Sequence, residues 1–487
     1  MGNATGNLAE YWEYTENSER MIGACIWDWV DQGINKVGRP DNEFYYGGDF
    51  GDRPNDGDFS CDGLVTPDRR TTAKLAETKK VYQYIKFHPV DLAAGSVEIE
   101  NRYDFTDLSE FVFTWELMKD GEVIESGCLS DIHGAPDAKV EVDVPFRENV
   151  GGSSEYFLNI RCTLADDTLW ADAGHEVAAE QFALTSRPAP AAERTVTDTL
   201  SAEMTEDGVV LSSGQFSVSF SGKDGRIAGL SYGGREMLDG QDAMTMLWYR
   251  SVGNDKFTDQ TAYPSEHVGT SFSCTVAEDS AGAVVKAEGY VDIAAEGKGW
   301  RMPYSVTYTV WADGVIDVDA SFTKPSGTEV IRRMGIGLAM LPGYENVRWY
   351  GKGPHENYID RCRSAAVGIY EETVEGFVSE HYVRAQSQGN REDTRWFEVT
   401  DDSGAGLRIE LLSGKMSFSA MHYTDADLWN IAHDYRLPEV RRDETLVNID
   451  VIQQGLGNAT CGPEPLPEYM IPEDSPMEYS FRISHIE

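Results

Sequence analysis

The amino-acid sequence predicts a multidomain protein that is mainly β, with a shorter α/β part at its N-terminal end. The chain has 487 residues, which is too long for one ordinary domain and favours about three. Hydrophobic residues make up 41% of the sequence and aromatic residues 11%, which suits packed cores and argues against a disordered chain. From about residue 89 onward, hydrophobic residues alternate with polar ones, as is typical of strands.

Residues 1–88 are predicted to form the α/β part. Leu8, Tyr11 and Trp12 have the spacing of one helical face, and they predict a first helix. The apolar stretch at 21–30 is predicted to be a buried strand.

A long polar loop, rich in glycine and aspartate, is predicted at 31–66. Loops of this length in compact domains are usually functional. A second helix is predicted at 67–82, with Asp68 as its cap. Strand, long loop and helix in this order form the unit of a (β/α)8 barrel, whose active sites lie on the loops after the strands. Only one or two such units are present, whereas a barrel needs eight.

The region at 89–187 is predicted to be a small β-sandwich. Hydrophobic residues alternate at 111–117 and again at 156–164, and the sequence KDGE at 119–122 predicts a turn. About one hundred residues of this kind are typical of a small sandwich.

A linker rich in proline and alanine is predicted at 188–199, and a second, larger β region at 200–487. Alternating stretches at 216–220, 304–310 and 316–322 predict antiparallel hairpins. The region is longer than a simple sandwich, so we expect an extended two-sheet super-sandwich.

Charge excludes one class of partner. Asp and Glu number 83 against 41 Lys and Arg, a formal net charge of −42. Such a field repels phosphate backbones, so nucleic acid is not expected as a partner. No apolar run approaches the length of a membrane span, so no membrane partner is expected either.

The seven cysteines form no CxxC pair and match neither a disulfide framework nor a zinc site. Most of them are expected to be buried small hydrophobic residues. This usage favours a reducing compartment.

The stretch GACIWDWVDQG at 23–33 is the first candidate site. Trp27 and Trp29 stand beside Asp28 and Asp31 at the end of the predicted strand, where side chains reach a cleft. An aromatic face beside carboxylates suits a sugar, because the C–H face of a pyranose packs on the ring and its hydroxyls need polar partners. The alternative is a core tryptophan, with the aspartates capping the next turn.

The loop sequence YYGGDFGDRPNDGDFSCDGLV at 45–65, together with IWDWVDQG upstream, closely resembles the β-galactosidases of glycoside hydrolase family 2. Three later stretches resemble the same family: YGKGPHENYIDR at 350–361, NREDTRWFEV at 390–399 and GLGNATCGPEPLPEY at 455–469. The resemblance therefore spans the whole chain.

This resemblance implies three domains. Residues 1–88 would be the C-terminal part, or edge, of a catalytic (β/α)8 barrel, and 89–187 an Ig-like β-sandwich. After the linker at 188–199, residues 200–487 would be a β super-sandwich of the small-chain type, with a mutarotase-like fold.

The resemblance also implies that the catalytic residues lie outside this chain. In the family, the motif EYxHAMGN ends a barrel strand and its glutamate is the nucleophile, whereas this chain begins at MGN. The nucleophile is then expected just upstream, and the acid/base glutamate further upstream. A retaining glycosidase needs two carboxyl groups about 5–5.5 Å apart, and no residue here occupies either family position. We expect the C-terminal portion of a retaining β-galactosidase, inactive by itself.

The expected partners are galactosides, the missing N-terminal half and, in the complete enzyme, further copies in a homo-oligomer. A cytoplasmic location is expected, or a periplasmic one if the missing half holds a leader.

The substrate-binding wall can be assigned by resemblance. Trp27 matches the aromatic residue that packs on the apolar face of galactose, whereas Trp29 is expected to pack in the barrel and Asp28 to orient the loop. Cys461 stands nearest to a position where some members have a tryptophan for the aglycone sugar, so the outer subsite is expected to be less aromatic.

Two cation sites are implied for the complete enzyme. Phe59, through its backbone carbonyl, and Asp62 match positions that help to bind sodium near the galactose 6-hydroxyl. The usual residue at Asp62 is asparagine, but a carboxylate is also a hard oxygen ligand. Asn55 and Asp56 lie where the family loop approaches a weak magnesium site, and loop capping is the alternative for them.

Five further residues match family motifs without an implied catalytic role. Asn254 and Asp255 are expected to be structural. His355, Glu356 and Arg361 resemble a catalytic His/Glu group, but a buried hydrogen-bond network that holds loops is favoured.

Two other functions remain open from the sequence. One is a non-catalytic carbohydrate-binding protein. The other is an aldose mutarotase, which needs a histidine base and a glutamate in one cleft. The candidates for these roles form no convincing motif: His422, His433, Glu439 and Glu444.

Overall fold

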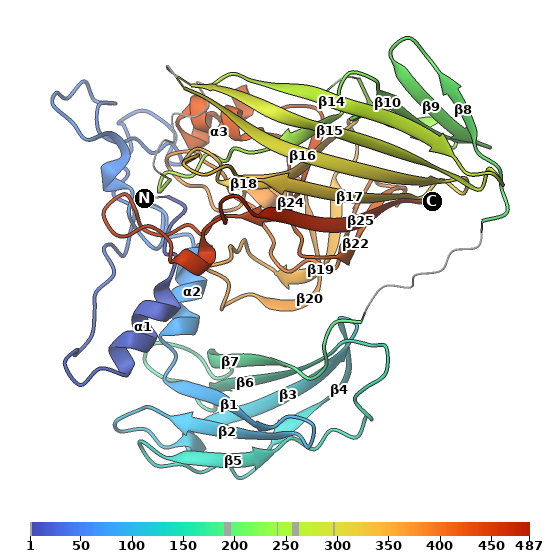
Figure 1. The fold of residues 1–487 in the computed structure, drawn as a ribbon. Coiled ribbons are helices and arrows are strands. Elements are labelled where there is room, and N and C mark those ends of the chain that lie inside the picture. The colour runs from blue at the N-terminus through green and yellow to red at the C-terminus, as the bar shows by residue number, and fades with distance from the viewer. Residues whose placement is uncertain (1, 189–195, 241, 256–262, 296–297) are drawn as a thin grey trace. The chain divides into compact units, whose positions relative to one another are not determined.

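The computed structural model describes residues 2–188, 196–240, 242–255, 263–295 and 298–487. By its internal contacts the chain divides into two units. The first contains Met1–Leu75, Ala192–Ala365 and Tyr370–Glu487, and the second Ala76–Ala191 and Ala366–Ile369. Strands make up most of the regular structure (Figure 1), which confirms the predicted multidomain β fold. The predicted linker at 188–199 falls largely on residues outside the described ranges.

The second unit is a β-sandwich of two antiparallel sheets. One sheet has the order β1-β2-β5 and the other β4-β3-β6-β7. The strands are β1 (Ile85–Asp91), β2 (Ser96–Asn101), β3 (Phe111–Lys119), β4 (Glu122–Leu129), β5 (Lys139–Asp143), β6 (Tyr156–Leu164) and β7 (Glu176–Ala183), and η2 (Leu108–Glu110) is a 3₁₀ turn. Side chains that alternate along the strands of both sheets fill one core, which includes Ile99, Trp115 and Ile160.

The predicted KDGE turn joins β3 to β4. Asp120 and Gly121 have φ of 50° and 90°, and two positive φ values in a two-residue loop suit the right-handed twist of a hairpin. The sequence therefore locates this hairpin correctly.

Most of the first unit is a large β structure. Its strands are β8 (Ser201–Met204), β9 (Gly208–Ser213), β10 (Phe216–Ser221), β11 (Ile227–Tyr232), β12 (Arg235–Asp239), β13 (Met244–Leu247), β14 (Ser265–Val276), β15 (Gly282–Ala295), β16 (Lys298–Trp311), β17 (Ile316–Thr323), β18 (Arg333–Met340), β19 (Asn346–Gly353), β20 (Ala366–Thr373), β21 (Trp396–Thr400), β22 (Gly406–Ser413), β23 (Ser417–Met421), β24 (Thr445–Gln453) and β25 (Pro476–Ile486). Between them lie α3 (Asp425–Ile431) and the 3₁₀ turns η4 (Glu375–Val378), η5 (Asp434–Glu439) and η6 (Pro467–Tyr469).

These strands form three sheets, of nine, five and four strands. The largest has the order β14-β15-β16-β17-β25-β22-β21-β19-β20, and long strands lie side by side in it (Figure 1). The others have the orders β12-β11-β10-β9-β8 and β13-β18-β24-β23. One continuous core contains side chains from all three, among them Val218, Val306 and Ile449. The predicted hairpins at 216–232 and 304–322 are present as β10–β11 and β16–β17.

Residues 2–75 have little regular structure, although they belong to the same unit. They contain α1 (Leu8–Glu16), η1 (Gly57–Ser60) and the start of α2 (Ala73–Val81). The two predicted helices are therefore confirmed. The predicted strand at 21–30 is wrong, because its backbone hydrogen bonds with residues 62–65 begin only at Asp28, its one β-bridge among the described residues joins Val30 to Val65, and Ile22 is fully exposed. A strand needs a neighbour along its length, and the pairing with residues 62–65 reaches only the last residues of this stretch.

Asp68 does not cap α2, which begins five residues later. The Asp68 carboxylate accepts hydrogen bonds from Thr66 Oγ1 and from Arg70 Nε, at 2.5 and 2.9 Å. The amide of Ala73, the first residue of α2, instead donates to Glu380 Oε2 at 2.9 Å. A carboxylate from the β structure thus serves the start of this helix, where free amide groups need acceptors.

The N-terminal residues of the described chain are buried in the β structure. Asn3 donates from Nδ2 to Tyr358 Oη and to the carbonyl of Ser387, both at 2.9 Å. Arg361 Nη1 donates to the carbonyl of Ala4 at 2.8 Å. Because these partners lie more than 350 positions away, the segment at 2–7 is held by the C-terminal domain.

Most of the seven cysteines are not buried. Only Cys61 and Cys162 of the seven free cysteines are buried, so the prediction that most are buried is wrong. The exposed Cys25 and Cys461 lie in loops, and Cys128 lies on the edge strand β4.

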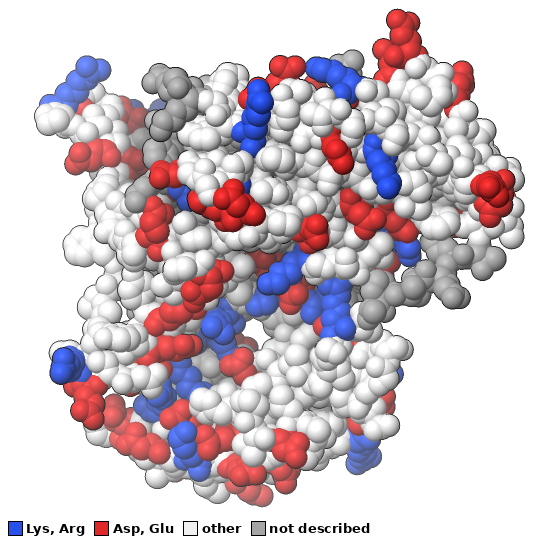
Figure 2. All heavy atoms as spheres, viewed as in Figure 1, with Lys and Arg blue, Asp and Glu red and all other residues white. Residues whose placement is uncertain are grey.

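Acidic side chains are spread over the visible face (Figure 2). No helix within the described ranges is long and apolar enough to cross a membrane.

Candidate functional site

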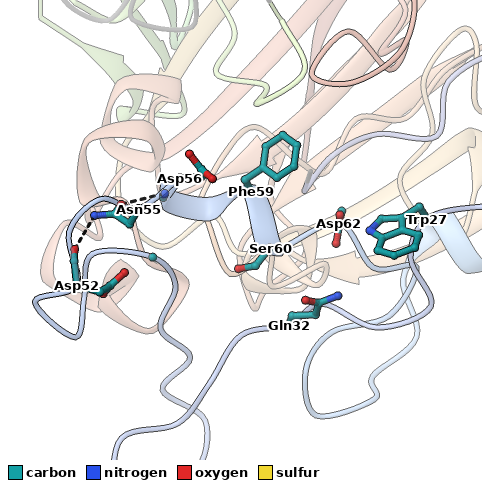
Figure 3. A pocket seen from close by; sticks show the side chains of 10 residues that line it. Trp27, Gln32, Asp52, Asn55, Asp56, Phe59, Ser60 and Asp62 are labelled. Carbon is teal, nitrogen blue, oxygen red and sulfur yellow. Dashed lines mark hydrogen bonds between the residues drawn. The ribbon is translucent and has the colours of Figure 1, made fainter.

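Ten residues line a pocket of about 420 Å³, which we name the Trp27 pocket (Figure 3). They are Trp27, Gln32, Gly47, Asp52, Asn55, Asp56, Gly57, Phe59, Ser60 and Asp62. The structure therefore brings together four of the five sequence-predicted site residues, Trp27, Asn55, Phe59 and Asp62. Cys461 does not line this pocket.

Backbone pairing places Trp27 next to Asp62. The amide of Asp28 donates to the carbonyl of Asp62 at 2.9 Å, and the amide of Leu64 donates to the carbonyl of Asp28 at 2.9 Å. Figure 3 shows the Trp27 indole and the Asp62 carboxylate at the same end of the pocket. Trp27 is 78% exposed, so its ring is available to a ligand and is not part of a core.

The neighbours of Trp27 have structural contacts. Asp28 accepts a hydrogen bond from Gln32 Nε2 at 2.9 Å, a contact within the loop it is predicted to orient. Asp31 is buried and accepts from the amide of Gly63 at 2.6 Å. Burial raises the pKa of the Asp31 carboxyl, while the nearby Lys74 ammonium opposes the shift. Trp29 is expected from the sequence to pack in the barrel, but it is 56% exposed among the described residues.

Asp62 has a free oxygen that suits a cation. Its Oδ1 atom is buried and has no hydrogen-bond partner among the described residues. A carboxylate oxygen in that state is costly unless a cation or donor meets it. Phe59, whose carbonyl is the other predicted sodium ligand, lines the same pocket. The described residues contain no group of three or more His, Cys, Asp or Glu side chains that could hold a metal.

Asn55 makes hydrogen bonds within its own loop. Its Nδ2 group donates to the carbonyl of Asp52 at 2.9 Å, and its Oδ1 atom accepts from the amide of Gly57 at 3.1 Å (Figure 3). These bonds agree with the loop-capping alternative. They leave less of the Asn55 side chain free for the predicted magnesium.

Cys461 lies in an exposed loop that contacts the N-terminal segment. Asn458 of this loop donates from Nδ2 to the carbonyl of Gly6 at 2.9 Å. Tyr469, after the loop, donates to Glu10 Oε1 at 2.5 Å. The C-terminal domain thus reaches the segment at 6–10, and Cys461 is exposed beside it.

The GPHENYIDR motif forms a buried network, as the sequence favours. Glu356 accepts from Arg361 Nη2, from Tyr382 Oη at 2.6 Å and from the amide of Gly389 at 2.8 Å. His355 contacts Ser364 Oγ at 2.8 Å and does not take part in a His–Glu pair. The carboxylate of Glu356 is therefore fully used in holding three segments of backbone together.

Asn254 and Asp255 are structural, as expected. Asp255 forms a two-pronged ion pair with Arg250, with both oxygen–nitrogen distances at 2.8 Å. Asn254 accepts from Thr460 Oγ1 at 2.6 Å and donates to the carbonyl of Gly457 at 3.1 Å. Asn254 thus holds the loop that carries Cys461 directly, and Asp255 pairs with Arg250, which donates to the carbonyls of Gln454 and Gly455 at the start of that loop.

The side chains of three candidate mutarotase residues have partners of their own. His422 pairs with Glu345 at 2.8 Å and is buried, and its other ring nitrogen contacts the carbonyl of Glu444. Glu439 pairs with Arg436 at the surface. His433 pairs with Asp49 at 2.8 Å, which is a partner that the sequence did not suggest.

Sequence reasoning missed several residues of the site. Gln32, Asp52 and Ser60 line the Trp27 pocket, and their position in the long polar loop is the only signal that could have found them. The pair of Asp49 and His433 has no local signal, because 384 positions separate the two residues.

Three family models match successive parts of the chain. The model described as "Glycosyl hydrolases family 2, TIM barrel domain" matches residues 1–87, "Beta-galactosidase, domain 4" matches 97–185, and "Beta galactosidase small chain" matches 212–483. The order agrees with the predicted barrel edge, sandwich and super-sandwich.

Two curated relatives are β-galactosidases that this chain matches over nearly its whole length. The protein from Priestia megaterium is 31% identical over 94% of this chain and 44% of that protein. The protein from Halalkalibacterium halodurans is 30% identical over 100% of this chain and 48% of that protein. This chain thus spans about half the length of the curated relatives that it matches.

Among solved structures, a putative aldose 1-epimerase from Escherichia coli K12 shares 10% identity over 60% of this chain and 99% of that chain. The TM-score of 0.33 is too low to bear on fold or function. The family assignment therefore rests on the sequence matches. Because the small-chain match alone covers more than half of the residues, the chain belongs to the β-galactosidases of glycoside hydrolase family 2.

Proposed function

We propose that this chain supplies part of the galactoside-binding wall of a β-galactosidase, an enzyme that hydrolyses terminal β-D-galactosides with retention. The observation that carries the proposal is the exposed Trp27 ring in one pocket with the unpartnered Asp62 oxygen. The flat apolar ring suits the C–H face of galactose. The polar side chains around it, such as Gln32 and Asp52, suit the hydroxyl groups.

The chain by itself is not expected to hydrolyse galactosides. Retention needs one carboxyl group as the nucleophile and another as the acid/base, about 5–5.5 Å apart. Neither family glutamate position matches a residue of this sequence. The missing N-terminal half, as a partner, would supply both groups, and a homo-oligomer is proposed for the complete enzyme.

Asp62 and the carbonyl of Phe59 are proposed to hold sodium in the complete enzyme. The buried, unpartnered Oδ1 atom of Asp62 supports this role. Bound there, the cation would fix a hydroxyl oxygen of the sugar. For Asn55, whose side chain is engaged in its own loop, a magnesium role is the weaker proposal.

Saturation-transfer NMR with methyl β-D-galactoside tests the binding wall on the chain as it is. We expect transfer to the protons of the C–H face in the unsubstituted chain and its loss in Trp27→Ala. The matched control is Trp170→Ala, which removes another exposed tryptophan (64% exposed) from the second unit and should leave transfer intact. Equal transfer in both variants would refute the role of Trp27.

Hydrolysis of a chromogenic galactoside tests the catalytic part of the proposal. The purified chain should show no turnover above a blank prepared from a host without its own β-galactosidase. Turnover at the rate of an ordinary β-galactosidase would mean that this chain contains a carboxyl pair that family resemblance does not reveal.

A further inference from the structure

The loop at 44–60, which we name the pocket loop, supplies most of the Trp27 pocket. Seven of the ten lining residues belong to it: Gly47, Asp52, Asn55, Asp56, Gly57, Phe59 and Ser60. Apart from η1 at Gly57–Ser60, the loop has no helix or strand. Its shape therefore depends on side-chain and backbone hydrogen bonds, and on what it is attached to.

Asp49 is the point at which the loop is fixed. Its Oδ2 atom accepts from the amide of Tyr46 at 2.8 Å, and its backbone carbonyl accepts from Lys36 Nζ at 2.6 Å. The third bond comes from the C-terminal domain, where His433 Nε2 lies 2.8 Å from Asp49 Oδ2. An ionised carboxylate can only accept, so the imidazole donates this bond. Bonds of this charge-assisted kind are among the stronger ones in proteins.

Aromatic packing holds the His433 ring in place for this bond. The ring stacks on Tyr46, with the centroids 4.4 Å apart and the planes 2° from parallel. The Tyr46 hydroxyl donates to the carbonyl of Ala432 at 3.2 Å. Burial raises the pKa of this phenol, which keeps the hydroxyl protonated as a donor. The loop and the backbone around His433 are thus joined at three points.

Hydrogen bonds connect the loop backbone beside Asp49 to residues that line the pocket. The amide of Gly47 donates to the carbonyl of Gly57 at 2.9 Å, and the amide of Gly48 donates to the carboxylate of Asp52 at 3.0 Å. The two sides of the loop approach so closely that a Cβ atom on Gly47 would lie 2.8 Å from the Gly57 carbonyl oxygen. A shift at Asp49 therefore moves Asp52 and Gly57, and with them the wall of the pocket.

We propose that His433 is a positioning residue for the Trp27 pocket, acting through Asp49 on the pocket loop. This positioning role follows from the contacts among His433, Asp49 and the pocket loop. Only the identity of the ligand rests on the proposed function. The hydrogen bond and ring contacts of the His433 side chain go to Asp49, Tyr45, Tyr46 and Tyr435, none of which lines the pocket. Because His433 belongs to a different domain of the sequence, the C-terminal domain sets the shape of a site on the barrel segment.

Hydrogen exchange of the full chain tests the loop. His433→Phe keeps an aromatic ring to stack on Tyr46 but removes the donor, and His433→Gln keeps an amide donor. The matched control is His422→Phe, which breaks the pair of the buried His422 with the partly exposed Glu345 at the same 2.8 Å distance, and neither residue belongs to the pocket loop. We expect the amides of Gly47, Gly48 and Gly57 to exchange about tenfold to a hundredfold faster in His433→Phe. The exchange rates of these amides should return toward those of the unsubstituted chain in His433→Gln and stay unchanged in His422→Phe.

Asp49→Ala provides the second variant if His433→Phe does not fold, because it removes the acceptor from the loop side and should speed the same amides. Unchanged loop exchange in a folded His433→Phe or Asp49→Ala chain would overturn the proposal, as would equal acceleration by His422→Phe.

Galactoside binding separates this inference from the proposed function. In the saturation-transfer experiment, His433→Phe should weaken binding of methyl β-D-galactoside and His433→Gln should restore it. If the loop responds in exchange but the unsubstituted chain binds no galactoside, the positioning role is supported and the proposed function fails. If the loop loosens and galactoside binding is the same in every variant, His433 does not position the pocket.

Discussion

Trp27 combines high exposure with a position fixed by the backbone around it. The hydrogen bonds of Asp28 and Leu64 hold its main chain, while its ring is 78% exposed at the pocket. A core tryptophan contributes stability, whereas an exposed one contributes little until a ligand covers it. Stability and binding are therefore separable at this residue.

Trp27→Ala should leave the thermal midpoint of the chain almost unchanged, because the ring loses little burial. Trp349→Ala is the contrasting variant, since Trp349 is 1% exposed in the core and its removal should cost about 3–5 kcal/mol. In an assembled enzyme, Trp27→Ala should lower kcat/KM about tenfold to a hundredfold, because a stacked aromatic face contributes up to about 3 kcal/mol. A lowered midpoint with unchanged kcat/KM would show instead that Trp27 is structural.

For single residues, the sequence predicts which ones belong to the site better than it predicts how buried each one is. Trp27, Phe59 and Asp62 stand in motifs that can be read from the sequence, and they do line one pocket. The exposure of Trp29 could not be read in the same way, because burial depends on neighbours from other segments. His433 has no motif at all, and its role follows only from a fold that brings it to Asp49.

Elements with local partners are the ones that the sequence predicts well. The hairpin of β3 and β4 needs only its own alternation and an Asp-Gly turn, and both are visible in the sequence. The stretch at 21–30 has the composition of a buried strand, but within the described residues it is paired only at its end, with residues 62–65. The start of α2 was misplaced for a related reason, because its acceptor, Glu380, lies 307 positions away.

Glu380 gives α2 a pH-dependent attachment. Burial, with a smaller contribution from Glu356, raises its pKa to about 7, although Arg361 opposes the shift. The ordinary pKa is 4.5, so the folded state holds this proton to higher pH than the unfolded state does. The contribution to stability is therefore present below pH 4.5 and is lost as the pH rises to about 7.

Glu380→Gln should remove this loss. The difference in free energy of unfolding, variant minus unsubstituted chain, should shift in favour of the variant by about 1–3 kcal/mol as the pH is raised from acidic to mildly alkaline. Denaturant unfolding at a series of pH values measures the difference. Glu375→Gln is the control, because that side chain is 65% exposed and should give a flat difference. A flat difference for Glu380→Gln as well would mean that this carboxyl is ionised in the folded state.

The pair of Glu356 and Arg361 connects the N-terminal segment to the β structure. Both side chains are 1% exposed, and Arg361 also donates to the carbonyl of Ala4. Removing one partner of a buried pair leaves an unpaired charge, so Arg361→Met should lower the free energy of unfolding by about 3–5 kcal/mol. Arg348→Met, whose side chain is 41% exposed in its pair with Glu371, should cost less than about 1 kcal/mol. Equal costs in urea unfolding would contradict a special role for Arg361.

At the scale of the whole chain, exposed hydrophobic side chains are concentrated in the barrel segment. Ten of the twenty large exposed ones within the described ranges lie between Tyr11 and Phe59, in about a tenth of the sequence. A surface of this kind usually faces another part of a protein. Because residues 1–87 match a barrel-domain model, we propose that further parts of a barrel would cover this surface in a complete enzyme.

Stability should therefore differ along the chain when it is studied by itself. The segment at 17–60 has one short 3₁₀ turn and many exposed apolar side chains, so its amides, including those held in the pocket loop, should open at a lower cost than global unfolding. Strands β15 to β18 and β22 to β25 surround one continuous core, so their amides should exchange only through global unfolding. Hydrogen exchange followed by mass spectrometry measures both regions in one experiment. The measurement should be made at two protein concentrations, since a second copy covering the apolar face would slow exchange at 17–60 only at the higher one. Protection as strong at 17–60 as in β15 to β18, at both concentrations, would show that the barrel segment is stable without a covering partner.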